Sequence, residues 1–231
     1  MEWEKLKVMT FNMHHGGGLD GKVDINRIAD VIGESGAQVV ALQEVDRYNV
    51  RSQFVDQVRK LGKKLRMHWC FATSLRLGIG RYGNATLSVW PLRKRKVYVF
   101  PGLSENRTAL HAQIVCRGRN IHIFNTHLSV SDDERRGQFR RLCKALRTAG
   151  DDPAILLGDF NMEFDHPLFR RLDSHWQRIA PKRKTATLAN GKEIDHIFVN
   201  RPAWGYKAVV IKTEASDHHA VVADIPLDVL Q

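Results

Sequence analysis

Apolar residues return at helical spacing in several stretches of the chain. In the first of these, Ile25, Ile28 and Ile32 fall on one side of a helix. Asp24 directly precedes them, and aspartate is favoured at the N-cap of a helix. On this pattern we predict helices over residues 24–34, 53–65 and 132–148.

The segments between these helices are short, rich in valine, isoleucine, threonine and aromatic residues, and separated by glycine, proline and asparagine. Such segments are typical of β-strands, and their close succession between residues 67 and 124 indicates an antiparallel or mixed sheet. We predict strands over residues 7–11, 38–42, 67–73, 84–90, 96–100, 107–116, 119–125, 154–157, 194–199, 208–212 and 220–225. No linker, internal repeat or low-complexity segment divides the chain, so we predict one α/β domain over residues 1–231, with two packed sheets flanked by helices.

The composition indicates a folded, basic protein. Of the 231 residues, 43% are hydrophobic, which is enough for a sizeable core and excludes a mostly disordered chain. Lysine and arginine number 36 against 25 aspartate and glutamate, so the formal net charge is +11. This excess indicates an anionic partner: nucleic acid, a phosphorylated small molecule or an anionic membrane surface. The basic stretches 59–66, 93–96 and 181–184 are candidate phosphate contacts.

Cysteine usage and the length of apolar runs bear on the compartment. The cysteines are scattered, odd in number and without Cys-x-x-Cys spacing, which argues against a disulfide scaffold and a structural zinc site. Residues 1–7 show no signal peptide, and no apolar run approaches the roughly 18 residues needed to span a bilayer. We therefore expect a cytoplasmic monomer without a transmembrane segment.

Polar residues suited to catalysis stand repeatedly where a predicted strand ends. Asn12 follows the first strand, and Asp159 follows the strand over 154–157. Because the strand ends of α/β sheets converge on one edge, we expect such side chains to share a pocket. The full set is Asn12, Glu44, His127, Asp159, Asn161, Asp195, Asp217 and His218.

The chemistry of this set suits a metal-dependent hydrolase. Its carboxylates and amides are hard oxygen ligands of the kind that Mg²⁺ or Mn²⁺ prefers. The imidazoles of His127 and His218 can transfer protons near neutral pH, and Asp195 can hold one of them in the required tautomer. The sequence shows no nucleophile elbow, P-loop or dinucleotide-binding fingerprint. The set therefore favours hydrolysis of a phosphate ester by metal-assisted attack of water.

Short motifs follow one another along the chain: TFNM at 10–13, LQEVD at 42–46, YGN at 82–84, NTHL at 125–128, GDFN at 158–161, IDHIF at 194–198 and SDH at 216–218. In this order they resemble the endonuclease/exonuclease/phosphatase superfamily, to which pancreatic-type deoxyribonucleases and sphingomyelinases belong. The resemblance covers nearly the whole chain. It implies a four-layer α/β sandwich, in which two mixed β-sheets pack face to face with helices on the outside.

The resemblance also implies how a metal and a general base would be held. Glu44 would be the principal metal ligand, with Asn12 and Asp217 beside the metal. His218 would be the general base that deprotonates water, and Asp195 would orient it.

The remaining residues of the motifs would act on the water and the substrate. Asp159 and Asn161 would position the water and the phosphoryl oxygens, and whether Asp159 or His218 accepts the proton stays open. His127 would donate to the scissile phosphate or protonate the leaving oxygen. Substrate binding would fall to Asn84, Arg107 and Tyr82.

We expect a divalent-metal-dependent phosphodiesterase, and the positive charge favours a nuclease that cleaves DNA or RNA. The alternatives are a phospholipid phosphodiesterase of the sphingomyelinase kind, a phosphatase of sugar or inositol phosphates, and a catalytically silent nucleic-acid-binding module. No apolar membrane-inserting hairpin is obvious, and the segment 71–82 is expected to form a substrate loop. His14 and His15 precede a glycine turn at 16–18, and both a substrate-facing role and an exposed loop role stay open for them.

Overall fold

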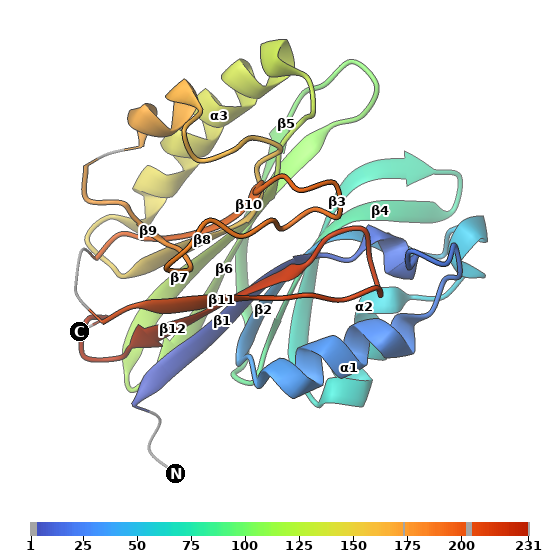
Figure 1. Ribbon diagram of the computed structural model, residues 1–231, viewed down its shortest axis with the longest axis horizontal. Coiled ribbons are helices and arrows are strands. Elements are labelled where there is room, and N and C mark those ends of the chain that lie inside the picture. Colours follow the sequence, from blue (N-terminus) through green and yellow to red (C-terminus); the bar gives the residue numbers. More distant parts are fainter. Residues whose placement is uncertain (1–3, 173, 202–204, 231) are drawn as a thin grey trace.

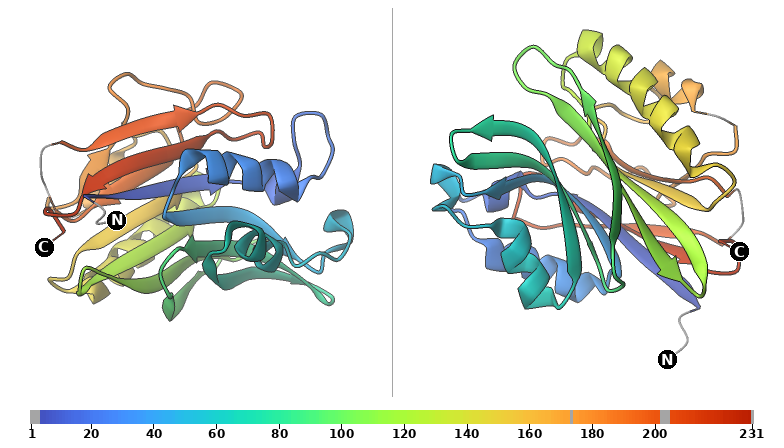
Figure 2. Two further views of the ribbon diagram at one scale, coloured as in Figure 1. Left: turned by 90° about the horizontal axis from the view of Figure 1, so that it is seen from below. Right: turned by 180° about the vertical axis from the view of Figure 1, so that it is seen from behind.

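The structure is a computed structural model, and it describes residues 4–172, 174–201 and 205–230. Two mixed sheets of six strands each pack face to face, and helices cover their outer faces (Figure 1). The views in Figure 2 show the same layers from below and from behind. This arrangement is the four-layer α/β sandwich that the resemblance implied, so the predicted fold class is confirmed.

The first sheet has the strand order β11-β12-β1-β2-β4-β3. Its strands are β1 (Lys5–Asn12), β2 (Val39–Arg47), β3 (His68–Leu77), β4 (Gly80–Ser88), β11 (Lys207–Ile211) and β12 (Ala220–Pro226). β1 and β2 run parallel, because the helix α1 (Ile25–Ser35) crosses over between them. The helix α2 (Gln57–Leu65) packs beside α1 on the outer face, and it begins four residues later than predicted because Asp56 caps it.

The second sheet has the strand order β5-β6-β7-β8-β10-β9. Its strands are β5 (Arg93–Phe100), β6 (Arg107–Cys116), β7 (Arg119–His127), β8 (Ala154–Asp159), β9 (Gln177–Ile179) and β10 (Asp195–Val199). The helix α3 (Asp132–Leu146) connects the parallel strands β7 and β8 and covers the outer face. The 3₁₀ helices are η1 (His14–Gly16), η2 (Val50–Ser52), η3 (Arg147–Ala149) and η4 (Pro167–Arg171). Within the ranges described above, none of the helices combines the length and apolarity that a membrane crossing requires.

Successive side chains of β1 point to opposite faces of the sheet and pack in two different clusters. Met9 packs in the cluster under α1 and α2, whereas Leu6 and Val8 pack in the cluster between the two sheets. Thr10 and Asn12 continue the face of Leu6 and Val8, and both are fully buried. The space between the sheets therefore changes from apolar to polar towards the end of β1.

Buried amides connect the two sheets near this polar end. Gln43 of β2 donates from Nε2 to Oδ1 of Asn125 in β7 over 2.8 Å. Asn125 in turn donates from Nδ2 to the carbonyl oxygens of Leu42 and Ala85, at 3.0 and 2.8 Å. A buried amide that loses its partners destabilises the fold, so these bonds favour one alignment of the two sheets.

A long hairpin stands where the sequence predicted a substrate loop over 71–82. β3 and β4 pair through this segment as far as Leu77 and Gly80, so the loop prediction is wrong. Leu77 and Ile79 at the tip are 56% and 75% exposed. The hairpin thus carries apolar side chains into solvent, which the sequence reading missed.

Gly158 lies where two backbones come very close. A methyl group at this position would stand 2.1 Å from the carbonyl oxygen of Thr126 on the paired strand β7. We expect Gly158→Ala to lower the free energy of unfolding, measured with urea, by about 1–3 kcal/mol. Gly137→Ala in α3 is the matched control, because nothing lies within 4 Å of the added methyl. That control should raise the stability by up to about 1 kcal/mol, and equal stability of the two variants would contradict the close approach.

Candidate active site

Strand ends from both sheets meet at one edge of the sandwich. β1 ends at Asn12, β7 ends at His127, β8 ends at Asp159 and β10 begins at Asp195. The last three lie side by side because His127 pairs with Asp159, and Asp159 pairs with Asp195, across neighbouring strands. The polar strand ends seen in the sequence therefore do share one location.

Asn12 joins the two sheets at this edge. Its Nδ2 donates to Oε1 of Glu44 and to Oδ2 of Asp159, both at 3.0 Å. Its Oδ1 accepts from the backbone N–H of His14 at 3.1 Å. In this arrangement Asn12 orients the two carboxylates. Its role as a direct metal ligand would require the opposite amide orientation and stays a prediction.

Glu44 reaches the edge because β2 is irregular there. The pairing of β2 with β4 shifts register between Leu42 and Val45, and Glu44 within this bulge has a φ of 59°. A bulge turns a side chain away from its regular place in the strand and is common beside active sites. Here it leaves the carboxylate half-buried and next to Asn12.

Asp195 and His218 form a buried pair. Nδ1 of His218 donates to Oδ2 of Asp195 at 2.9 Å, and Nε2 lies 3.8 Å from Oδ2 of Asp159. Burial alone would lower the pKa of His218, but the negative charges of Asp195 and Asp159 and the hydrogen bond outweigh it and raise this pKa. Burial, and then the charge of Asp195, raise the pKa of Asp159. Such displaced pKa values are typical of groups that transfer protons in an active site.

His127 stands on the other side of Asp159. Its Nε2 lies 3.4 Å from Oδ2 of Asp159 and 3.3 Å from Nδ2 of Asn161. Arg107 places Nη1 3.0 Å from Nδ1 of the same ring. Burial, then the charges of Arg107 and His218, hold the pKa of His127 well below its usual value. The direction of this shift favours the neutral form of the His127 imidazole.

The sequence from residue 9 to residue 218 matches the model of the Endonuclease/Exonuclease/phosphatase family. The match covers most of the chain and includes every site residue described above. The chain belongs to the endonuclease/exonuclease/phosphatase family. Enzymes of this family hydrolyse phosphate esters with the help of divalent metals. A search of curated proteins gave no match.

Solved structures of endonuclease/exonuclease/phosphatase proteins share the fold. An endonuclease/exonuclease/phosphatase from Beutenbergia cavernae is 22% identical, with a TM-score of 0.79 over 97% of this chain and 72% of that chain. Truncated TDP2 of Caenorhabditis elegans is 19% identical, with a TM-score of 0.75 over 96% and 97%. The human Nocturnin catalytic domain with bound sulfate is 18% identical, with a TM-score of 0.71 over 97% and 94%.

A divalent metal of the kind that the endonuclease/exonuclease/phosphatase family uses fits the donors at this edge. Two groups of described residues have possible ligand atoms within 4.8 Å of one another, namely Asp159, Asp195 and His218, and His14, His15 and Glu44. In the first group Asp195 and His218 already bind each other. In the second group Glu44 is half-buried, and it shares the amide of Asn12 with Asp159. A metal centred on Glu44 stays a prediction.

The other residues singled out by the family motifs have partners of their own. Asp217 is half-exposed, and its Oδ1 lies 3.7 Å from Nδ1 of His14. Asn84 is buried and donates to the carbonyl oxygen and the hydroxyl of Thr108, at 3.0 and 3.2 Å. Tyr82 is also buried, which raises the pKa of its hydroxyl. Metal binding by Asp217 and substrate binding by Asn84 and Tyr82 stay predictions.

Arg51 is a site residue that the sequence analysis missed. It binds Asp46 through Nε at 2.8 Å, and its guanidinium lies 5.2 Å from the centre of the Tyr82 ring. The 3₁₀ turn η2 brings it back to this edge. Arg51 comes soon after the motif at 42–46, but nothing in the pattern shows that the chain folds back there.

The basic stretch 93–96, a candidate phosphate contact, lies away from the site. β5 runs antiparallel to β6, so Phe100 pairs with Arg107 at the site end. Arg93 pairs with Gln113 at the opposite end of the same ladder. The positive charge at the site therefore does not come from residues 93–96.

The pairing of His218 with Asp195 predicts a displaced titration. In the metal-free chain we expect the His218 imidazole to titrate above the usual pH of about 6.5, because nearby carboxylates outweigh its burial. Asp195→Asn should lower this pKa by about one pH unit or more, which NMR titration of the histidine resonances measures. The resonance of exposed His68 serves as the control that the substitution leaves unaffected.

The same displacement makes stability depend on pH. Because the pKa of His218 is higher in the folded state, protonated His218 stabilises the fold. This stabilisation is complete below a pH of about 6.5 and is lost as the pH rises through the folded-state pKa. An unchanged His218 titration in Asp195→Asn would contradict this account.

Proposed function

We propose that this chain is a divalent-metal-dependent phosphodiesterase that acts on DNA or RNA. Family membership already makes it a metal-dependent hydrolase of phosphate esters. The observation that best supports a catalytic centre at this edge is the junction at Asn12, where one amide binds carboxylates from both sheets. A histidine–aspartate pair and an arginine-bound histidine stand beside this junction. Groups for proton transfer and for phosphate binding therefore lie at one edge.

Asp159 and His218 would activate the water. The 3.8 Å between their Oδ2 and Nε2 atoms is too long for a direct hydrogen bond, and a water at the side of the pair would contact both atoms. Asp195 holds the imidazole so that Nε2 faces this gap, and Asp159 or His218 then accepts the proton. Mg²⁺ or Mn²⁺ at Glu44, with Asn12 nearby, would supply charge that stabilises phosphoryl oxygens and lowers the pKa of water.

His127, Asn161 and Arg107 would stabilise the charge that develops on the phosphate. Asn161 and Arg107 both lie within 3.3 Å of ring nitrogens of His127, so the three side chains form one group of donors. Hydrogen-bond donors fixed in a partly desolvated site stabilise a transition state with negative oxygens. A ring N–H of His127 would donate to the scissile phosphate, whereas its lowered pKa argues against His127 as the acid that protonates the leaving oxygen.

Positive charge at the edge favours a polyanionic substrate. Beyond the effect of burial, Arg107 lowers the pKa of His127 and Arg51 lowers the pKa of His15, so both arginines act on the site. The net charge of +11 adds a long-range attraction for a phosphate backbone.

Cleavage of supercoiled plasmid and of a labelled single strand, with Mg²⁺, Mn²⁺ or EDTA, tests the proposal. We expect metal-dependent cleavage that falls by about 10²–10⁴-fold in His218→Ala, since general acid–base catalysis contributes by such a factor. Glu44→Ala should also lose cleavage, and excess Mn²⁺ should restore part of it.

His68→Ala is the control for these variants. It removes an exposed imidazole that pairs with Ser88, at the end of the hairpin opposite Gly80, and should cleave at the wild-type rate. Equal cleavage by wild type and His218→Ala would contradict the assignment. If neither nucleic acid is cleaved, the substrate is instead a phospholipid or a small phosphate ester.

A phospholipid is the second candidate substrate, because apolar side chains are exposed beside the site. Val50, Phe54, Leu77 and Ile79 are each more than half exposed, and together with Arg51 they line a cavity of about 290 Å³. Apolar side chains next to a cation suit the surface of an anionic membrane. The hairpin tip supplies two of them, which removes the sequence-based objection to this substrate class.

The double substitution Leu77→Ser and Ile79→Ser separates the two substrate classes. For a nuclease we expect unchanged plasmid cleavage and no hydrolysis of phospholipid vesicles by the wild type. For a lipid phosphodiesterase, the double variant should hydrolyse anionic vesicles at least about tenfold more slowly, because it loses apolar area that binds the bilayer. Hydrolysis of a soluble phosphodiester should be equal in both proteins and serves as the control.

A further inference from the structure

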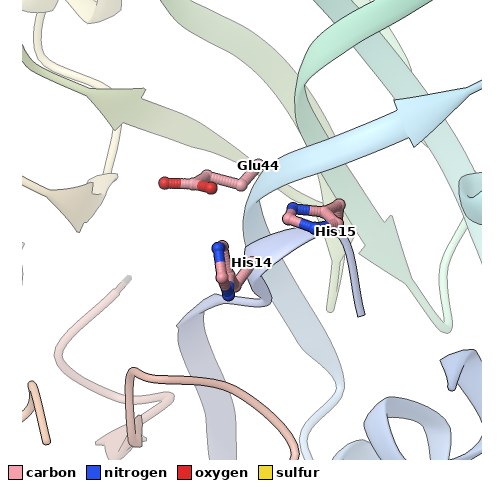
Figure 3. A group of neighbouring side chains, drawn as sticks. All are labelled: His14, His15 and Glu44. Atoms are coloured by element: carbon pink, nitrogen blue, oxygen red, sulfur yellow. The ribbon is translucent and has the colours of Figure 1, made fainter. Parts of the chain in front are cut away.

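Two histidines lie beside Glu44 and have no task in the proposed reaction. Figure 3 shows His14 and His15 next to Glu44, which stands on β2. The possible ligand atoms of the three side chains lie within 4.8 Å of one another, and all three are half-buried. The imidazole rings are 4.4 Å apart between their centres, with 68° between their planes. Two nitrogen donors and a carboxylate therefore share a small space.

The backbone is strained at all three residues. His14, His15 and Glu44 have φ angles of 42°, 46° and 59°, a region that costs residues other than glycine about 1–2 kcal/mol each. Hydrogen bonds hold the strained turn: His14 N–H donates to Asn12 Oδ1 at 3.1 Å, and Gln57 Nε2 donates to the carbonyl of His15 at 2.6 Å. Strain maintained by such bonds at neighbouring residues points to a functional constraint.

The imidazoles are arranged as metal-binding histidines are. Nδ1 of His14 lies 3.3 Å from the carbonyl oxygen of Gly17 and 3.7 Å from Oδ1 of Asp217. A metal-binding histidine usually donates one ring N–H to such an oxygen, which leaves the other nitrogen for the metal. Nδ1 of His15 is buried and has no hydrogen-bond partner among the described residues. A bound ion would satisfy a nitrogen that is otherwise costly to bury.

We propose that His14 and His15 supply imidazole ligands to the metal at Glu44, so that the site takes Mn²⁺, Co²⁺ or Zn²⁺ in preference to Mg²⁺. Imidazole suits transition ions such as Zn²⁺, whereas Mg²⁺ prefers oxygen ligands and retains its water. The carbonyl oxygen of Gly17 then positions the His14 ring. The inference rests on the proposed function only in that Glu44 serves the same metal.

Metal titration of the EDTA-treated full chain tests this inference without any substrate. Co²⁺ is followed by its visible absorption, which reports nitrogen ligands, and Mg²⁺ by calorimetry. We expect His14→Asn and His15→Asn to raise the Kd for Co²⁺ at least about tenfold, since loss of even an outer partner of a ligand costs 10–100-fold. The Kd for Mg²⁺ should change less than about twofold, because imidazole contributes little to Mg²⁺. Asparagine is chosen because it tolerates the left-handed backbone.

His68→Asn is the matched control and should bind Co²⁺ as the wild type does. An unchanged Kd for Co²⁺ in His14→Asn and His15→Asn would overturn the inference. Should these variants fail to fold, the wild type still decides: diamagnetic Zn²⁺ should shift the ¹⁵N resonance of one ring nitrogen of His14 and of His15, and unshifted resonances would overturn the inference. Absence of nucleic-acid cleavage together with the expected Co²⁺ binding would contradict the nuclease proposal alone.

Discussion

The amide of Asn12 donates to Glu44 in its own sheet and to Asp159 in the opposite sheet, and the arrangement of the site depends on these two hydrogen bonds. Each binds a carboxylate, so each contributes about 1.5–3 kcal/mol when made and leaves a costly buried group when lost. Without the shared donor, two carboxylates brought together at the end of the sandwich would repel each other. Asn12 is fully buried, so water cannot take its place.

The packing of the two sheets positions Asn12 for these hydrogen bonds. Leu6 and Val8 pack between the sheets at one end of β1, and Thr10 and Asn12 occupy the same face at the other end. Apolar packing therefore holds the sheets together while the polar end remains free for chemistry. The amides of Gln43 and Asn125 bridge the sheets at this polar end, and their bonds favour one alignment of the strand ends.

Much of the fold and of the site could be predicted from the sequence. Short segments rich in valine, isoleucine, threonine and aromatic residues predicted every described strand except β9, and the ordered motifs indicated the sandwich. Strand ends then placed Asn12, His127 and Asp159 together, because parallel strands end at the same edge. The grouping of these side chains follows from local pattern and topology alone.

The parts that could not be predicted depend on tertiary geometry. The apolar tip of the β3–β4 hairpin was mistaken for a loop, since exposed apolar residues interrupt the usual alternation of strands. Arg51 reaches the site only because η2 folds back. The left-handed conformations of His14 and His15 carry no sequence signal, yet they turn both rings towards Glu44. That residues 1–231 form a single domain stays a prediction.

Diffraction from crystals soaked in Mn²⁺, recorded at the manganese absorption edge, tests most directly whether this edge is a metal-dependent centre. The account predicts an anomalous peak within roughly 2.0–2.6 Å of a carboxylate oxygen of Glu44, beside Asn12 and Asp159. Manganese held by Asp195 and His218 alone, or no peak near Glu44 under conditions in which Mn²⁺ supports hydrolysis, would contradict it.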